Sequence, residues 1–275
     1  MTSYTRDNSR LANDYDRMSD FQFESGKKIF ERLGLAAGGR VLDLGCGTGR
    51  LAGWIAERLG ADNVVGIDPL PDRIAMAREH VPGVRFEVGR AEDLSAFADA
   101  SFDGVLLSAV FHWIPDKPKA LAEIARVLRH GGRMGLTTHP KDLQMASTMA
   151  RTLASIFSRP QYQHRVQRDS FAIARQSCTV SETLAMLLEN NLDLVELHVV
   201  ERIVRHKSAD ELLDFMESSA FGNFLDAIPT ELQGAFRADF EAALSSEKGP
   251  EGIALRDHGM LLVARRAGGG ERPFM

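Results

Sequence analysis

Val41-Leu42-Asp43-Leu44-Gly45-Cys46-Gly47-Thr48-Gly49-Arg50 is the most informative stretch of this 275-residue chain. Its first four residues have the apolar pattern of a buried strand. After Gly49, apolar residues recur at helical spacing, at Leu51, Ile55, Ala56 and Leu59. Glycine is needed where the backbone has positive φ or where a ligand lies directly against it. The stretch therefore predicts a strand, a tight turn that binds a small molecule, and a helix. An ordinary glycine-rich loop is the alternative.

The glycine spacing indicates which small molecule this is. Dinucleotide-binding loops have the spacing G-x-G-x-x-G, and here Arg50 stands at the third glycine position. The spacing G-x-G-x-G after Leu42-Asp43 instead resembles motif I of the class I S-adenosylmethionine (SAM) dependent methyltransferases. The resemblance implies SAM as cofactor and S-adenosylhomocysteine as product. The implied contacts of the methionine half are Asp43, Gly45, Cys46, Gly47 and Gly49.

A second apolar run, Val64 to Asp68, ends in a carboxylate and is followed by Pro69. An ionised carboxylate offers two oxygens, so Asp68 is placed to accept hydrogen bonds from both ribose hydroxyls of the cofactor. Pro69 is a neighbouring candidate contact. An NAD-binding fold has an acid in a similar place, so Asp68 alone does not distinguish the two cofactors.

The third predicted strand, Val84 to Val88, leads into Gly89-Arg90-Ala91-Glu92-Asp93-Leu94. This segment resembles the G-D-A-E-D-L sequence that holds adenine in many of these methyltransferases, which implies Ala91 and Glu92 as adenine contacts. Arg90 departs from the pattern, because a guanidinium only donates hydrogen bonds and cannot accept one from the adenine amino group. Either Glu92 replaces the missing acceptor, or packing holds the adenine.

The fourth predicted strand continues into Ala109-Val110-Phe111-His112-Trp113-Ile114-Pro115-Asp116. Ligands of open α/β sheets bind at the carboxyl ends of the strands, so this segment should border both cofactor and substrate. It resembles the corresponding segment of trans-aconitate and juvenile-hormone-acid methyltransferases, which methylate small carboxylic acids. Ser108 and Trp113 are therefore expected near the cofactor, and Phe111 and His112 near the acceptor.

His112 is the candidate general base, since an imidazole with a pKa near ~6.5 accepts a proton at neutral pH. In the alternative interpretation, His112 and Trp113 form a structural pair at the strand end. Methyl transfer from a sulfonium requires mainly alignment and a dry site, so a base is not essential.

Further apolar runs at Met134 to Thr138, Leu194 to Val204 and Gly259 to Ala264 bring the strands to seven. The fold class is α/β, a Rossmann-like, mostly parallel sheet with an antiparallel last strand and helical lid insertions. The resemblance covers residues 41–138. The expected organisation is an N-terminal segment with the SAM-binding core (1–140), a helical lid insertion (141–178), a core helix and strand six (179–207), a second helical lid insertion (208–250), the last core strand (251–266) and a flexible tail (267–275).

Local signals also define several helix ends. Thr179-x-x-Glu182 and Ser208-x-x-Glu211 predict capping boxes. The helix that begins near Asp116 is expected to end at Gly131-Gly132.

Three further candidates lie in the second half of the chain, and one near the start. An arginine is suited to binding a carboxylate, so Arg165, with Tyr162 and His139, is expected to contact the acceptor. Ordinary charges on a solvated helix face are the alternative. Tyr15 lies in a segment similar to those that fold over the methionyl end of SAM; the alternative is a solvated leader.

Composition bounds the partners and the location. The chain has 33 basic and 38 acidic residues and a net charge of −5, which argues against a nucleic-acid-binding surface. No signal peptide pattern and no apolar run approaching ~18 residues is present, so no membrane partner is expected. Cys46 and Cys178 show no metal-binding spacing. We expect a reduced, cytoplasmic monomer or homodimer that acts on a small molecule.

The sequence thus predicts SAM-dependent methyl transfer to a small-molecule acceptor, with O-methylation of a carboxylate or hydroxyl preferred to N-methylation. A non-catalytic SAM-binding regulatory protein is one alternative, suggested by Arg90. A methyltransferase acting on RNA or protein is another, disfavoured by the charge and the expected lid. A nicotinamide dehydrogenase is the last.

Overall fold

The computed structural model describes residues 7–166, 176–221 and 224–268, the side chain of Met145 excepted. Its centre is one sheet with strand order β3-β2-β1-β4-β5-β8-β6. The strands are β1 (Val41–Leu44), β2 (Val64–Asp68), β3 (Arg85–Val88), β4 (Phe102–Ser108), β5 (Leu128–Thr138), β6 (Leu192–His206), β7 (Lys248–Gly249) and β8 (Gly252–Arg266). Strands β1 to β5 pair in parallel, whereas β8 lies antiparallel between β5 and β6. The predicted fold class is therefore confirmed, with the two-residue β7 as an additional strand.

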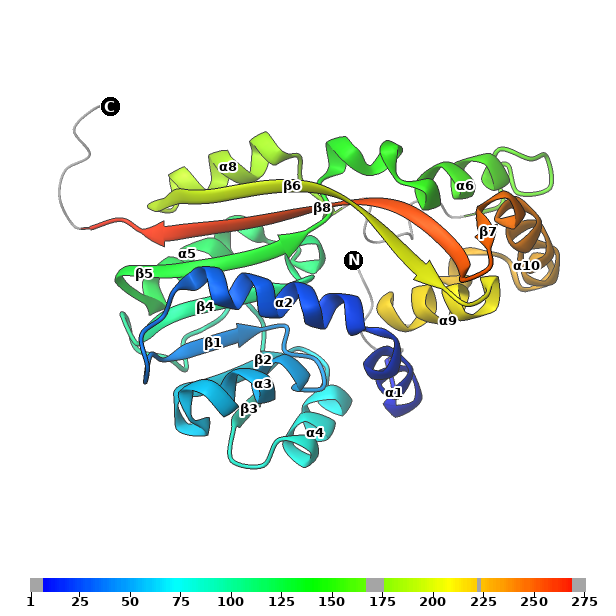
Figure 1. Cartoon of the computed structure of the whole chain (residues 1–275). Coiled ribbons are helices and arrows are strands. Elements are labelled where there is room, and N and C mark those ends of the chain that lie inside the picture. The colour runs from blue at the N-terminus through cyan, green and yellow to red at the C-terminus, as the bar shows by residue number, and fades with distance from the viewer. Residues whose placement is uncertain (1–6, 167–175, 222–223, 269–275) are drawn as a thin grey trace.

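Helices cover both faces of this sheet (Figure 1). One face packs against α2 (Asp20–Leu33), α3 (Arg50–Leu59) and α4 (Pro71–His80), and the other against α5 (Lys117–Val127) and α8 (Val180–Glu189). Because both faces are covered, every residue of β1 and β2 is buried. This explains why these strands are continuous apolar runs in the sequence.

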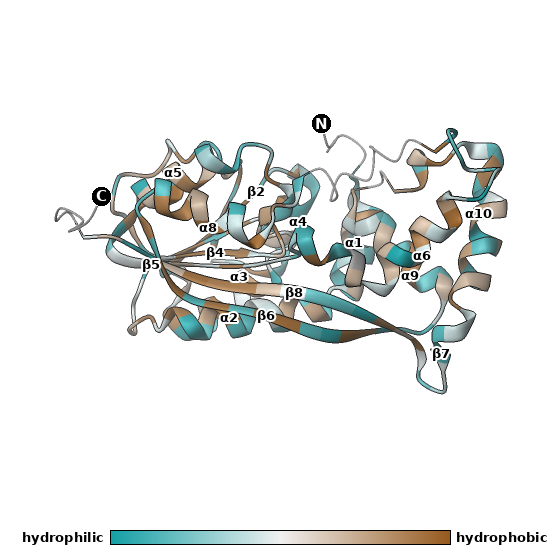
Figure 2. Cartoon of the chain, turned by 90° about the horizontal axis from the view of Figure 1, so that it is seen from above, coloured by the Kyte–Doolittle hydropathy of each residue, from teal (hydrophilic) through white to brown (hydrophobic). Residues whose placement is uncertain are grey.

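Strands β6 and β8, of 15 residues each, continue beyond the end of β5 as a two-stranded ribbon (Figure 2). The ribbon reaches a group of helices that we call the cap: α6 (Thr148–Phe157), α9 (Ala209–Ser219) and α10 (Thr230–Ala243). The cap has a core of its own, which includes the buried Tyr162, Phe236 and Phe240. The N-terminal helix α1 (Ser9–Met18) lies against α9 and α4. The cap thus stands at one end of the sheet.

The end of α5 differs from the prediction. The helix stops at Val127, and β5 begins at Leu128 rather than after Gly131-Gly132. Leu128 is fully buried and pairs with Phe102, after which the register moves to Gly104 opposite Arg133. Burial of Leu128 in the sheet therefore overrides the glycine pair as the helix stop.

Both predicted N-caps are present. Thr179 and Glu182 form the complete capping box of α8. At α9, the Ser208 side chain accepts from the Glu211 amide, while the Glu211 carboxylate accepts from Lys207 rather than from Ser208. Within the described parts of the chain, no helix combines the length and apolar character needed to cross a membrane. Most of the expected flexible tail, 269–275, lies outside the described residues.

Candidate functional site

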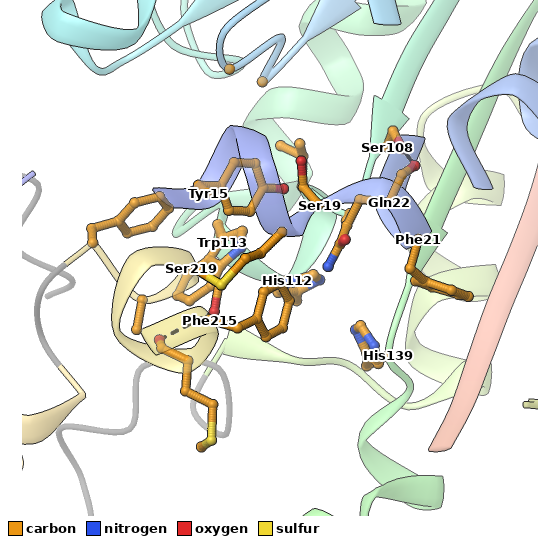
Figure 3. A pocket seen from close by; sticks show the side chains of 18 of the residues that line it. Tyr15, Ser19, Phe21, Gln22, Ser108, His112, Trp113, His139, Phe215 and Ser219 are labelled. Carbon is orange, nitrogen blue, oxygen red and sulfur yellow. Dashed lines mark hydrogen bonds between the residues drawn. The ribbon is translucent and has the colours of Figure 1, made fainter. Parts of the chain in front are cut away.

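A cavity of about 1120 Å³ lies at the carboxyl ends of β1, β2 and β4, between the sheet and the cap. Single-ligand pockets measure roughly 300–1,000 Å³, so this cavity is large enough for a cofactor together with a small acceptor. Tyr15, Ser19 and Ser108 line one part of it, and His112, His139 and Phe215 line another (Figure 3). The site therefore draws on both the sheet and the cap.

Glycine is required for different reasons at the three glycine positions after β1. All have positive φ, but a Cβ on Gly45 would lie 2.3 Å from Val110, and one on Gly49 would lie 2.9 Å from both Ala77 and Phe86. Those two positions are required by packing within the protein, and Gly49 does not line the cavity. Gly47 lines it and has no atom within 4 Å of its Cβ position, so only Gly47 leaves open space for a ligand.

Asp43, at the end of β1, is a carboxylate without a partner. It is 1% exposed, and its Oδ2 has no hydrogen-bond partner in the described structure. Burial, reinforced by the nearby Asp68 charge, raises the pKa of Asp43 to about 7. A cationic ligand group beside it would remove the cost of ionising this carboxyl.

Asp68, at the end of β2, joins two loops. Its oxygens accept from the backbone amides of Gly47 (2.9 Å) and Leu70 (3.0 Å). Burial raises the pKa of Asp68, although the Arg73 charge and these two amides oppose the shift. Each carboxylate oxygen accepts more than one hydrogen bond, so Asp68 retains acceptor capacity toward the cavity.

Two other buried polar atoms that line the cavity have no partner in the described structure. They are Oε1 of Gln22 and Nδ1 of His258. Buried polar groups are hydrogen-bonded in the great majority of cases, so with Asp43 these orphans indicate a site for a polar ligand. Sequence reasoning missed Gln22 and His258, because neither belongs to a motif.

The expected adenine segment lines the cavity at Arg90, Ala91 and Glu92, beside Pro69. The Arg90 guanidinium lies 3.4 Å from the Glu92 carboxylate. Arg90 stands where the resemblance leads us to expect an acid. It is therefore paired with Glu92, the residue that would take over the role of that acid.

The segment before α2 is docked on the glycine loop. Arg73 of α4 donates two hydrogen bonds of 3.1 Å to Asp7, and the Thr48 hydroxyl bonds to Asp16 of α1. The Tyr15 ring lies 4.7 Å from the Arg73 guanidinium, and no described residue bonds to the Tyr15 hydroxyl at the cavity. Burial raises the pKa of Tyr15, which is therefore neutral at physiological pH.

His112 is buried at the end of β4. Its Nδ1 lies 3.1 Å from the Thr138 hydroxyl, and no described residue bonds to its Nε2. Burial, together with the positive groups around it, holds the pKa of His112 well below its ordinary value, so the imidazole is neutral. Its ring centre lies 5.2 Å from that of Trp113, which packs in turn against Phe221 at 4.8 Å. His112 and Trp113 therefore pack together as a structural pair, and both also line the cavity.

Arg202 and Asp257 were not predicted. They are opposite each other in the β6–β8 register, and Asp257 accepts from Nε (2.9 Å) and Nη2 (2.6 Å) of Arg202. Nη2 also lies 2.5 Å from Nε2 of His139. Burial would raise the pKa of Asp257, but the bonds and charges of His139 and Arg202 outweigh burial and hold it low. Arg202, Asp257 and His139 thus form a cluster that lines the cavity.

The remaining candidates have the following places. Ser108 lines the cavity and donates to the Gln22 carbonyl (3.2 Å). Cys46 also lines the cavity, and burial raises the pKa of its thiol well above the ordinary value.

Phe111 is buried in the sheet core. Tyr162 lies in the cap core and donates to Asp239 (2.7 Å), and Arg165 pairs with Glu231 (2.5 Å). The structure brings none of these last three to the cavity.

Comparisons with known proteins find methyltransferases similar to this chain. Residues 42–136 match a family described as a methyltransferase domain. A trans-aconitate 2-methyltransferase of Methylobacterium nodulans is 28% identical over 260 residues, which cover 93% of this chain and 97% of the relative. One of Variovorax paradoxus is 26% identical over 82% of this chain and 85% of the relative. An uncharacterized methyltransferase of Mycobacterium tuberculosis is 41% identical over 124 residues, 45% of this chain and 49% of the relative.

Solved structures show the same fold. The YcgJ protein of Bacillus subtilis superposes with a TM-score of 0.60 at 21% identity, over 90% of this chain and 99% of that one. A geranyl diphosphate methyltransferase in complex with SAM superposes with a TM-score of 0.51 at 18% identity, over 89% of this chain and 85% of that one.

Proposed function

Because this chain belongs to the class I SAM-dependent methyltransferases, with its methyltransferase domain at residues 42–136, we propose that it methylates an oxygen atom of a small organic acceptor. A carboxylate or a hydroxyl is preferred to an amine. The observation that carries the proposal is a cavity of about 1120 Å³ that has an orphaned carboxylate in one part and a neutral imidazole in another.

The residues of the glycine-loop part suit SAM. The unpartnered Asp43 oxygen fits the cationic methionyl end, and the space over Gly47 fits a group lying against the backbone. Asp68 would accept from the ribose hydroxyls, and Ala91 and Glu92 would border the adenine. Tyr15, Cys46, Pro69, Ser108 and Trp113 would complete the walls.

Bound SAM supplies a methyl group on a sulfonium, and the electron pair of the broken S–C bond stays on the sulfur. The chain contributes alignment of the acceptor oxygen and exclusion of water, which are the main requirements of such a displacement. α1 and the cap border the cavity, and the described parts of the insertions at 141–178 and 208–250 act as its lid. A small acceptor follows from this enclosure, because a folded RNA or protein would need an open cleft.

His112 acts on the acceptor through Nε2. With a hydroxyl acceptor, the proton passes to Nε2 as the O–C bond forms; with a carboxylate, there is no proton to remove. A lowered pKa makes His112 a weak base. This favours acceptors that are already ionised. The two relatives named trans-aconitate 2-methyltransferase support an oxygen acceptor, since trans-aconitate is a carboxylic acid.

The test is methyl transfer from labelled SAM to a panel of carboxylic acids, phenols and amines, with the products identified by mass spectrometry. We expect labelled esters or ethers. His112→Asn keeps an amide near Thr138 but removes Nε2, so we expect kcat for hydroxyl acceptors to fall by about 10²-fold or more with an unchanged SAM affinity. His130→Asn, at an exposed histidine outside the cavity, is the control. Products labelled only on nitrogen would refute the oxygen preference, and SAM binding without any transfer would refute the enzymatic proposal.

A further inference from the structure

The cavity contains a potential anion-binding site in the cluster of Arg202, Asp257 and His139. The Arg202 side chain is only 17% exposed, and its guanidinium lies 4.1 Å from the centre of the Phe21 ring. Its Nε and Nη2 contact Asp257 and His139, but no described residue accepts from its Nη1. A guanidinium has five N–H donors, so the two on Nη1 remain for a ligand.

His139 is the third member of the cluster. Its Nε2 lies 2.5 Å from Nη2 of Arg202 and 3.2 Å from the Asp257 carboxylate. No described residue bonds to its Nδ1. The tautomer that accepts from Arg202 on Nε2 carries its proton on Nδ1. In this tautomer Nδ1 of His139 joins Nη1 of Arg202 in offering N–H donors that suit the two oxygens of one carboxylate.

The surroundings disfavour an acceptor with several negative charges. Asp257 already offsets the charge of Arg202. In the part of the cavity formed by the ribbon and α9, acidic side chains outnumber basic ones: Asp210, Glu211, Asp214 and Asp257 against Arg202, Arg205 and Lys207. A tricarboxylate would bring two further negative charges into this net-negative part of the cavity.

The same part of the cavity is lined by rings. Phe221, Trp113, His112 and His139 form a continuous row, with centres 4.8, 5.2 and 5.3 Å apart. Phe215 also lines this part, and Figure 3 shows it beside His112. These rings are tilted to one another by 60°, 48° and 78°, so they offer both faces and edges to a flat, conjugated ligand, and aromatic rings pack favourably by stacking or edge contact.

From this geometry we infer that the acceptor is a flat, conjugated organic acid with a single carboxylate, which Arg202 and His139 bind while its apolar part lies along the row of rings. The inference rests on the proposed function and specifies its acceptor class. Gly259 on β8 supports the arrangement, because a Cβ there would lie 2.6 Å from Nη1 of Arg202. The chain has no side chain at this position, where a Cβ would displace the guanidinium group.

Calorimetry on the protein saturated with S-adenosylhomocysteine tests the inference without requiring turnover. The probes are 4-hydroxycinnamate, its methyl ester and citrate. We expect 4-hydroxycinnamate to bind roughly 10- to 100-fold more tightly than the ester, and citrate to bind more weakly than both. Equal binding of the acid and the ester, or preference for citrate, would overturn the inference.

Three variants test which residues bind the carboxylate of the acceptor. Arg202→Met should abolish the preference for the acid over the ester. Gly259→Ala should reduce the preference for the acid over the ester. This variant keeps Arg202 as the partner of Asp257, so its effect is not caused by an unpaired buried carboxylate. Arg256→Met, at an exposed arginine of the same ribbon outside the cavity, should leave the preference unchanged. An acid preference that survives in both test variants would overturn the assignment. Binding of the acid without oxygen methylation of any acceptor would refute the proposed function alone.

Discussion

Among single residues, Asp43 shows a conflict between stability and binding. A carboxyl that is 1% exposed and unpartnered on one oxygen destabilises the folded chain whenever it is ionised. Its folded-state pKa of about 7 lies above the ordinary value of 3.8. Its contribution to stability is therefore most favourable below pH 4 and is lost as the pH rises toward 7. A cationic ligand would reverse this effect by favouring the ionised form.

Asp43→Asn should therefore stabilise the ligand-free protein and weaken SAM binding. At pH 8 we expect a gain of roughly 2–4 kcal/mol in the free energy of unfolding, shrinking toward zero at pH 4. The wild-type affinity for SAM should rise as the pH increases through 7, whereas that of the variant should be flat and lower. Urea unfolding and calorimetry across this pH range measure both. A variant that is less stable at pH 8, or that binds SAM normally, would contradict this account.

Among secondary-structure elements, α1 is tied to α4 by a buried ion pair just before its first turn. The Arg73 and Asp7 side chains are 4% and 2% exposed and meet in a two-bond contact. Removing one partner of such a pair leaves a buried charge, whereas exposed pairs contribute little. The same arginine packs on Tyr15 and acts on Asp68, so α1 and the expected cofactor contacts are linked.

Arg73→Met should consequently release α1 and weaken SAM binding together. We expect a loss of about 3–5 kcal/mol in the stability of this contact, seen as faster amide exchange over residues 9–18. Arg85→Met breaks an exposed pair with Glu87 and should change stability by about 1 kcal/mol or less. Unchanged exchange in α1 after Arg73→Met would show that other contacts hold the helix.

At the scale of the whole molecule, the cavity lies between two separately packed cores. The sheet core surrounds β1, β2, β4 and β5, while the cap core is built around Phe236 and Phe240. The glycine loop belongs to the sheet, where Cys46 packs with residues of α3 and α4, and the row of rings ends at Phe221, two residues after the cap helix α9. Damage to one core should therefore affect one ligand more than the other.

Phe236→Ala should separate the two binding functions. Truncating this fully buried ring should cost about 3–5 kcal/mol of stability, measured by urea unfolding. At a temperature where the variant remains folded, we expect the KM for the acceptor to rise while the SAM affinity stays within about threefold. Phe86→Ala, in the sheet core beside Gly49, is the matched control and should weaken SAM binding as well. Equal effects of the two variants on SAM would argue against independent cores.

The sequence by itself determined the parts of this protein that depend on neighbouring residues. Hydrophobic periodicity and turn chemistry act over a few positions, so they indicated the glycine loop after β1, the acid at the end of β2 and the capping box of α8. The carboxyl ends of parallel strands share one edge, which is why a site at this edge could also be predicted.

Only the tertiary structure decided which distant side chains reach the cavity. Arg202 and Asp257 meet because of the register between β6 and β8, and Gln22 faces the site because α2 packs beside β4. These contacts correspond to no motif or residue spacing in the sequence. Tyr162 and Arg165 were expected at the acceptor, but packing of the cap directs them to Asp239 and Glu231. Side-chain direction follows from long-range pairing and packing, which local patterns do not contain.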